Sequence, residues 1–125
     1  IFTIKGNDLV TEYQIISNNY KLPKINGFQS GFSDAILVDD KIYFLATAED
    51  TTSTYDDGEI LGSIIGRMDS QTFEIELTLK ISDNHKFEGL TLYKKTETEI
   101  QFLLCEDNDS DLLETNIYQL SLKTN

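Results

Sequence analysis

The sequence predicts an all-β protein built from antiparallel four-stranded sheets. Helical periodicity is almost absent, and short apolar or alternating runs recur instead, each followed by Gly, Asn, Asp or Ser. The runs also form a larger repeat of about 55 residues, which begins near Phe32 and again near Phe87. Repeated strand units indicate β-propeller blades, and this period exceeds their usual length of about 40–50 residues because the acidic loops are long. We therefore expect a partial β-propeller, with two blades and two strands of a preceding one.

Nine runs have the character of β-strands. They cover residues 2–5, 9–17, 32–38, 41–48, 63–69, 72–81, 87–93, 100–106 and 115–122. Asp39-Asp40 lies between two runs and reads as a two-residue hairpin turn. Residues 72–80 alternate between apolar and polar, which predicts an edge strand with one face in water. Residues 42–46 and 100–105 are almost continuously apolar, which predicts strands covered on both faces.

The repeat divides the chain into four parts. Residues 1–17 are expected to be the last two strands of a preceding blade, and residues 18–31 a linker. Residues 32–82 are expected to form a complete blade, and residues 83–125 a final blade with three strands. Because the chain begins at Ile1 without an initiator Met, we expect a piece of a longer product. The missing outer strand would come from another segment or another copy.

The composition excludes several classes of partner and metal. The chain has 10 basic and 22 acidic residues and a net charge of −12, which disfavours nucleic-acid binding. It contains no apolar run near the roughly 18 residues that a membrane span needs, so no membrane partner is expected. With a single Cys and a single His, an internal disulfide or a Cys- or His-rich metal site is excluded. Oxygen ligands remain, which favour Ca²⁺ or Mg²⁺. Solubility alone is the alternative explanation of the charge.

The alternation of turns predicts where the acidic residues lie. In an up-and-down blade, the connection into the first strand shares an end with the loop between the second and third strands. Twelve acidic residues fall in these segments: Asp34, Glu49, Asp50, Asp56, Asp57, Glu59, Glu88, Glu106, Asp107, Asp109, Asp111 and Glu114. We therefore expect one strongly acidic end.

Crowded carboxylates need either solvent or a cation between them. Two of them about 4 Å apart repel by roughly 4 kcal/mol at an effective dielectric constant of 20. The stretch 107–111 has the alternate-carboxylate spacing of calcium loops, although Leu112 and Tyr118 replace the Gly and Glu of an EF-hand. Solvated polar turns are the alternative. The candidate Ca²⁺ ligands are Glu49, Asp50, Asp57, Glu59, Glu88, Asp107, Asp109 and Asp111.

Three single residues carry further expectations. His85 lies three residues before Glu88 and is expected to be an exposed turn residue, with proton transfer as the alternative. Arg67 is expected to form a structural ion pair, and Cys105 to be buried as a small apolar side chain. No nucleophile elbow, P-loop or HExxH motif is present, so the sequence assigns no catalytic residue.

Two motifs resemble known proteins. Residues 55–63, Tyr-Asp-Asp-Gly-Glu-Ile-Leu-Gly-Ser, and residues 86–90, Lys-Phe-Glu-Gly-Leu, resemble an uncharacterised bacterial family expected to be propellers. The Glu-Gly-Leu of residues 88–90 opens a strand and is followed about 20 residues later by an acidic turn. This pattern resembles the broader phytase-like and esterase-like propellers. That resemblance implies calcium near the propeller axis, held first by Glu88, Glu49 and Asp107, and in some members phosphate-ester hydrolysis.

Two functions follow as expectations. The first is a fragment of a bacterial propeller whose acidic, calcium-binding loop face lets the parent protein bind or act on a small anionic ligand. For phosphate, that face offers mainly Lys86 and His85. The alternative is a non-catalytic interaction or scaffold domain that self-associates through open sheet edges and so completes the open blade.

Overall fold

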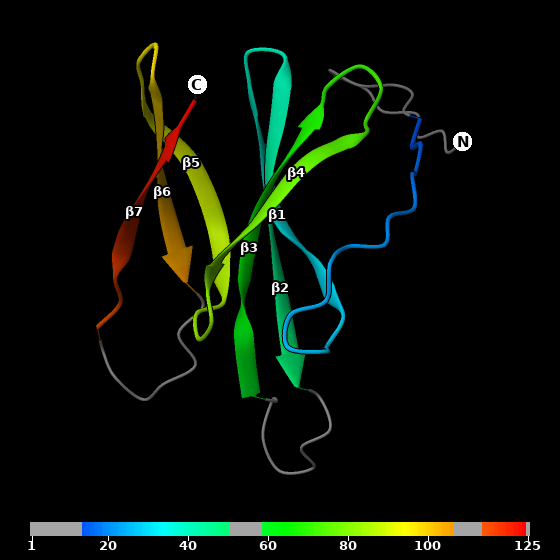
Figure 1. The fold of residues 1–125 in the computed structure, drawn as a ribbon, viewed down its shortest axis with the longest axis vertical. Helices are drawn as coiled ribbons and strands as arrows, with labels where there is room; N and C mark the ends of the chain where they lie inside the picture. The colour runs from blue at the N-terminus through cyan, green and yellow to red at the C-terminus, as the bar shows by residue number, and fades with distance from the viewer. Residues whose placement is uncertain (1–13, 51–58, 107–113, 125) are drawn as a thin grey trace, which may run out of the picture.

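The structure, a computed structural model, describes residues 14–50, 59–106 and 114–124. These residues contain seven β-strands and no helix. The predicted all-β class is therefore confirmed (Figure 1). The strands are β1 (Ser30–Val38), β2 (Lys41–Asp50), β3 (Glu59–Asp69), β4 (Ile75–Ser82), β5 (Phe87–Lys95), β6 (Glu99–Glu106) and β7 (Ile117–Lys123).

The strands form two antiparallel sheets in which sequence neighbours pair. The first sheet has the order β1-β2-β3-β4, and the second has the order β5-β6-β7. The expected succession of a four-stranded unit and a three-stranded unit is confirmed. The hairpin turn at Asp39-Asp40 is also confirmed, with Asp39 at a φ of 55°. β4 lies at the edge of its sheet, as its alternation predicted.

The two sheets repeat the same pairing register. Both first strands carry an irregularity at the same point, between Phe32 and Asp34 in β1 and between Phe87 and Gly89 in β5. Beyond it, Ala35 pairs with Phe44 as Leu90 pairs with Leu104. In the same way, the pair Asp34 and Leu45 corresponds to the pair Gly89 and Cys105. The repeat is thus a structural one.

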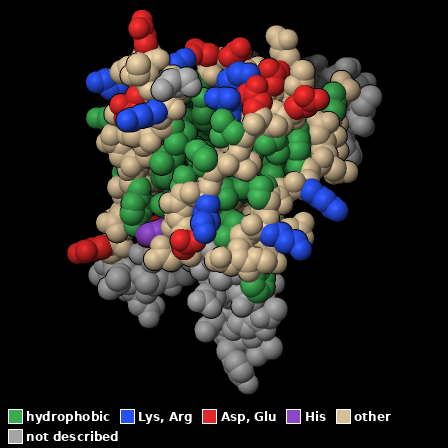
Figure 2. Space-filling view, in the orientation of Figure 1, with side chains coloured by type: hydrophobic (Ala, Val, Ile, Leu, Met, Phe, Trp, Pro, Cys, Tyr) green, Lys and Arg blue, Asp and Glu red, His purple; other side chains and the backbone are tan. Residues whose placement is uncertain are grey.

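The main core lies between the two sheets, which face each other. It contains Val38, Tyr43, Leu45, Ile65, Phe87, Leu90, Ile100, Phe102 and Leu104. The rings of Tyr43 and Phe102 meet across it, with centroids 5.1 Å apart. Close backbone contacts between the sheets join β5 to β1 and β2. Figure 2 shows hydrophobic side chains across the middle of the molecule and charged ones gathered above them.

The outer face of the four-stranded sheet is partly covered by the segment that precedes β1. Ile25 is buried there against Ala46, Ala48 and Ile64. The segment turns back on itself through the Ile25–Phe28 bridge, where Gly27 has a φ of 85° that favours glycine. The strand expected over residues 9–17 is wrong in its described part, because residues 14–17 form no strand. Residues 2–5 lie outside the described residues.

Burial of β6 differs from the expectation. Ile100, Phe102 and Leu104 are buried, but Cys105 on the opposite face is exposed. The expectation that both faces of this strand are covered, and that Cys105 is buried, is therefore wrong for the described chain. The physical reason is that no described segment packs on the outer face of the three-stranded sheet.

The connections divide the molecule into two ends. At the hairpin end lie the short turns 39–40, 70–74 and 96–98. At the other end, here called the loop end, β2 and β6 finish and β5 begins (Figure 1). Successive connections therefore alternate between the two ends, as the strand order predicted. This alternation determines which strand termini lie at the same end.

Candidate functional site

The loop end gathers the strand termini that carry the candidate calcium ligands. Glu49 and Asp50 are the last two residues of β2, and Glu59 is the first residue of β3. Asp50 pairs directly with Glu59 in the backbone register. Glu88 is the second residue of β5, and Glu106 is the last residue of β6. The backbone thus brings acidic positions from both sheets to one end.

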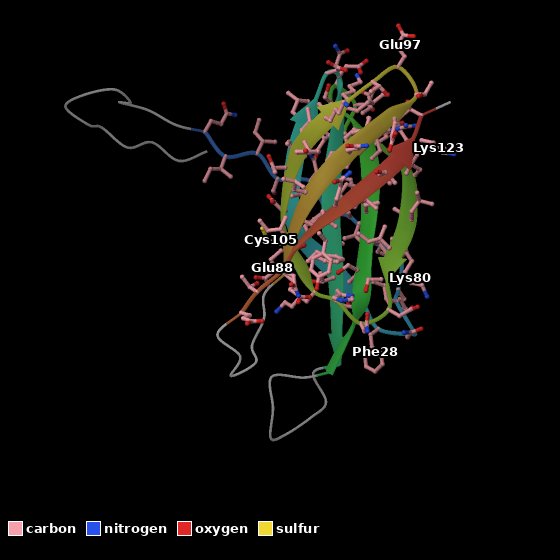
Figure 3. All side chains as sticks on the ribbon, turned by 90° about the vertical axis from the view of Figure 1, so that its left-hand side faces the viewer. Phe28, Lys80, Glu88, Glu97, Cys105 and Lys123 are labelled. Atoms are coloured by element: carbon pink, nitrogen blue, oxygen red, sulfur yellow. The ribbon has the colours of Figure 1, made fainter. Side chains whose placement is uncertain are left out.

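Glu88 is the candidate ligand whose side chain the structure describes. Its side chain is 44% exposed, and its Oε1 lies 3.4 Å from Nζ of Lys86. Both residues line an open depression. Its other walls come from the residues just before β1, from the start of β1 and from β2; these are Phe28, Gln29, Gly31, Phe32, Ser33 and Thr47. Figure 3 shows Glu88 and Cys105 toward the loop end, and Glu97 and Lys123 at the hairpin end. Glu88 is therefore available to a ligand in solvent.

The other seven candidate side chains lie outside the described part of the structure. Asp57, Asp107, Asp109 and Asp111 lie outside the described residues, and for Glu49, Asp50 and Glu59 only the backbone is described. Among the described residues, no group of three or more His, Cys, Asp or Glu side chains is arranged to hold a metal ion. The calcium site therefore stays a prediction.

Asp34 joins the two sheets. Its Oδ2 accepts a hydrogen bond from the backbone N–H of Leu90 at 2.7 Å, and its Oδ1 accepts one from Ala35 N–H at 2.8 Å. One residue earlier, the Ser33 hydroxyl donates to the carbonyl of Phe87 at 2.7 Å. Oδ2 of Asp34 and the Ser33 hydroxyl thus hold β5 beside β1, whereas Oδ1 bonds within β1 itself. This is a structural role that the sequence did not indicate.

The Gly62-Ser63 pair that ends the first resemblance motif is also structural. The Ser63 side chain is fully buried; its hydroxyl donates to the His85 carbonyl at 2.6 Å and accepts from Phe87 N–H at 3.1 Å. Gly62 has a φ of 131°, and a Cβ there would collide with the Ser82 carbonyl. This end of the motif therefore secures the connection from β4 to β5.

His85 is half-buried, so the expectation of an exposed turn residue is wrong. Its ring stacks on Phe87 at 5.4 Å with an interplanar angle of 6°, and meets Tyr118 edge-on at 5.3 Å. Its Nδ1 lies 2.7 Å from the Ser82 hydroxyl. That hydroxyl oxygen also accepts the backbone N–H groups of Asn84 and His85, so it is occupied by the turn. The arrangement orders the β4–β5 connection.

A cluster of ion pairs stabilises the hairpin end. Lys41 Nζ lies 2.8 Å from Glu76 Oε2, and Arg67 Nε lies 3.0 Å from Glu76 Oε1, which confirms the expected ion pair of Arg67. The hydrogen bond from Lys41, with a smaller one from Arg67, lowers the pKa of Glu76. The same carboxylate raises the pKa of Lys41.

Asp69 belongs to the same end. Its Oδ1 accepts hydrogen bonds from the backbone N–H groups of Thr72 and Gln71, each at 2.8 Å, and these lower its pKa. Its Oδ2 lies 3.5 Å from Lys41 Nζ. Lys41 and Arg67 of this end are therefore matched with carboxylates.

The fold and the loop end together define an all-β protein of two antiparallel sheets, with acidic positions of both sheets at one end. The described strands and turns include no helix that is long and apolar enough to cross a membrane. Residues 2–122 match the model of DUF6929, a family of unknown function, and the chain belongs to this family. No curated protein and no solved structure matches it significantly.

Proposed function

We propose that this chain contributes two adjacent blades to a β-propeller whose loop end binds Ca²⁺ through carboxylates of both blades. The observation that carries the proposal is the topology, because the termini of β2, β3, β5 and β6 that bear acidic residues lie at the same end. The repeated pairing register supports the blade assignment, since two sheets of one design succeed each other along the chain.

Charge supports the choice of a hard divalent cation. The loop end carries most of the acidic candidates, and two described cations of this end, Lys86 and Lys80, already have carboxylate partners in Glu88 and Asp83. A bound Ca²⁺ would offset the mutual repulsion of the carboxylates, and it takes about 6–8 oxygen ligands in flexible geometry. With coordination positions left over, such an ion holds a small anionic ligand. Carboxylates and phosphates are the ligand classes that it would take.

Calcium titration of chelator-treated protein by calorimetry tests this proposal. We expect measurable binding heat and a rise in melting temperature, equivalent to about 2.7 kcal/mol at a hundredfold excess of Ca²⁺ over Kd. Glu88→Gln together with Asp107→Asn should weaken binding, whereas Glu97→Gln at the hairpin end should not. Absence of both heat and thermal shift at millimolar Ca²⁺ would contradict the proposal.

A second candidate function is self-association through the edge of β7. The observation that favours it is the unequal strand number, because β7 occupies the third position of its sheet and nothing described pairs with its outer edge. Such an edge accepts a strand from another chain through backbone hydrogen bonds. In this case the chain acts as a non-catalytic scaffold domain.

Hydrogen exchange at the β7 edge tests the second function. If a strand adds to β7, the backbone amides that face its outer edge become protected as the protein concentration rises. Edge amides that exchange at one rate over the whole concentration range would contradict it.

A further inference from the structure

The repeated register shows that equivalent faces of the two sheets are used differently: the face that points into the core in one sheet points outward in the other. In the four-stranded sheet, Tyr43 and Leu45 face the other sheet. In the three-stranded sheet, the residues at the same register positions are Leu103 and Cys105, and they lie on the outer face. A face that is buried in the first sheet is therefore open in the second.

The converse holds for the opposite faces. Phe87, Phe102 and Leu104 of the three-stranded sheet are buried between the sheets, at 5% exposure or less. Their counterparts in the four-stranded sheet are Phe32, Ile42 and Phe44, which lie on its outer face. The outer face of the three-stranded sheet thus corresponds to the inner face of the four-stranded sheet, and the reverse also holds. The two outer faces are therefore equivalent to the two faces that pack together in the core.

Both outer faces keep apolar residues in solvent. Ile117, beside Cys105 in the register, is 68% exposed on the three-stranded sheet. On the four-stranded sheet, Leu37 is 62% exposed and Phe32 is 49% exposed. A groove next to Phe32 is lined by Asn18, Tyr20, Ala35, Ile42, Phe44, Met68 and Phe73. Both faces therefore offer apolar side chains that a protein partner could bury.

We propose that the outer face of the three-stranded sheet binds the outer face of the four-stranded sheet in a second copy of this chain. The contact is head-to-tail, because two different faces meet, and it repeats the relation between the two sheets within one copy. The proposal rests on the blade assignment in the proposed function but does not involve calcium.

The contact between copies should be weaker than the one inside the chain. Asp34 holds Leu90 across the internal contact, whereas its register counterpart in the second sheet is Gly89, which has no carboxylate. The segment around Ile25 also covers part of the receiving face. We therefore expect reversible association that depends on protein concentration.

Sedimentation velocity in the presence of a chelator tests the interface. Ile117→Lys alters the three-stranded face and Leu37→Lys the four-stranded face; both positions are exposed, so both variants should fold, as circular dichroism checks. We expect the wild type and the control Glu97→Gln to associate as concentration rises, and each face variant to remain monomeric. An equimolar mixture of the two variants should form a one-to-one dimer, since each keeps the face that the other lacks.

Three results would overturn the proposal. They are a wild type that stays monomeric at every concentration, face variants that associate like the wild type, and a mixture that forms no dimer. Failure of calcium binding would leave this experiment unchanged, because the chelator is present throughout.

Discussion

Single residues stabilise the packing within and between the two sheets, and the residue type alone does not predict the contacts that several of them make. Asp34 is predicted among the acidic residues of the loop end, but it lies in the middle of β1 and uses both carboxylate oxygens on backbone N–H groups. Ser63 is a buried hydroxyl with two backbone partners. Gly66 is a glycine because the ring of Phe44 occupies the place of its side chain.

Removing the Asp34 carboxylate should loosen the contact between the sheets. Asp34→Ala leaves the Leu90 N–H without its partner, and such a loss destabilises by about 1–3 kcal/mol. Glu88→Ala is the matched control, since its exposed carboxylate has an ion pair with Lys86 in water, of the kind that contributes little. Urea denaturation of both variants measures the difference. Equal stabilities would contradict the assigned role of Asp34.

A methyl group at Gly66 should be poorly tolerated. The added Cβ would overlap the Phe44 ring, and overpacking of this kind costs about 1–3 kcal/mol. Gly31→Ala is the control, because a Cβ at Gly31 has no neighbour within 4 Å and its φ is not positive. Thermal and urea unfolding of the two variants should rank Gly66→Ala well below Gly31→Ala. The reverse order would show that Phe44 moves aside.

At the scale of the elements, the sequence predicted the positions of the strands better than it predicted the environment of single side chains. All seven described strands coincide with predicted runs, because alternation and turn residues report locally on a strand and its ends. The burial of Cys105 was predicted wrongly, since a continuous apolar run shows that both faces are fit to be covered, not that the described chain covers them. The sequence repeat predicts that Glu49 at the end of β2 corresponds to Glu106 at the end of β6. In the pairing register the counterpart of Glu106 is instead Ala46, since Phe32 pairs with Ala46 as Phe87 pairs with Glu106.

The turns of the hairpin end should lose their ionic support in acid. The folded-state pKa values of Glu76 and Asp69 are lowered, so their contribution is present above the unfolded-state pKa and is lost as pH falls through the folded-state value. The wild type should therefore be more stable than Glu76→Gln at neutral pH, and this difference should shrink below about pH 4. Urea titrations at both pH values measure it, with Glu97→Gln as the control. A constant difference would contradict the ion-pair assignment.

At the scale of the whole molecule, the chain is a pair of similar sheets with unlike ends. At the hairpin end Lys41 and Arg67 share the carboxylate of Glu76, whereas the loop end gathers acidic strand termini of both sheets. The sequence predicted this polarity from strand order alone, because turns alternate between ends. It did not predict that Asp34 is used internally, since a carboxylate bound to a backbone N–H and one bound to a cation have the same local sequence pattern.

Amide NMR of the chelator-treated protein during a Ca²⁺ titration tests the central claim most directly. We expect chemical-shift changes at the loop end, in the residues around Asp50, Glu59, Glu88 and Glu106, and unchanged signals at the hairpin turns. Shifts spread evenly over both ends, or no shifts at millimolar Ca²⁺, would contradict a calcium-binding loop end.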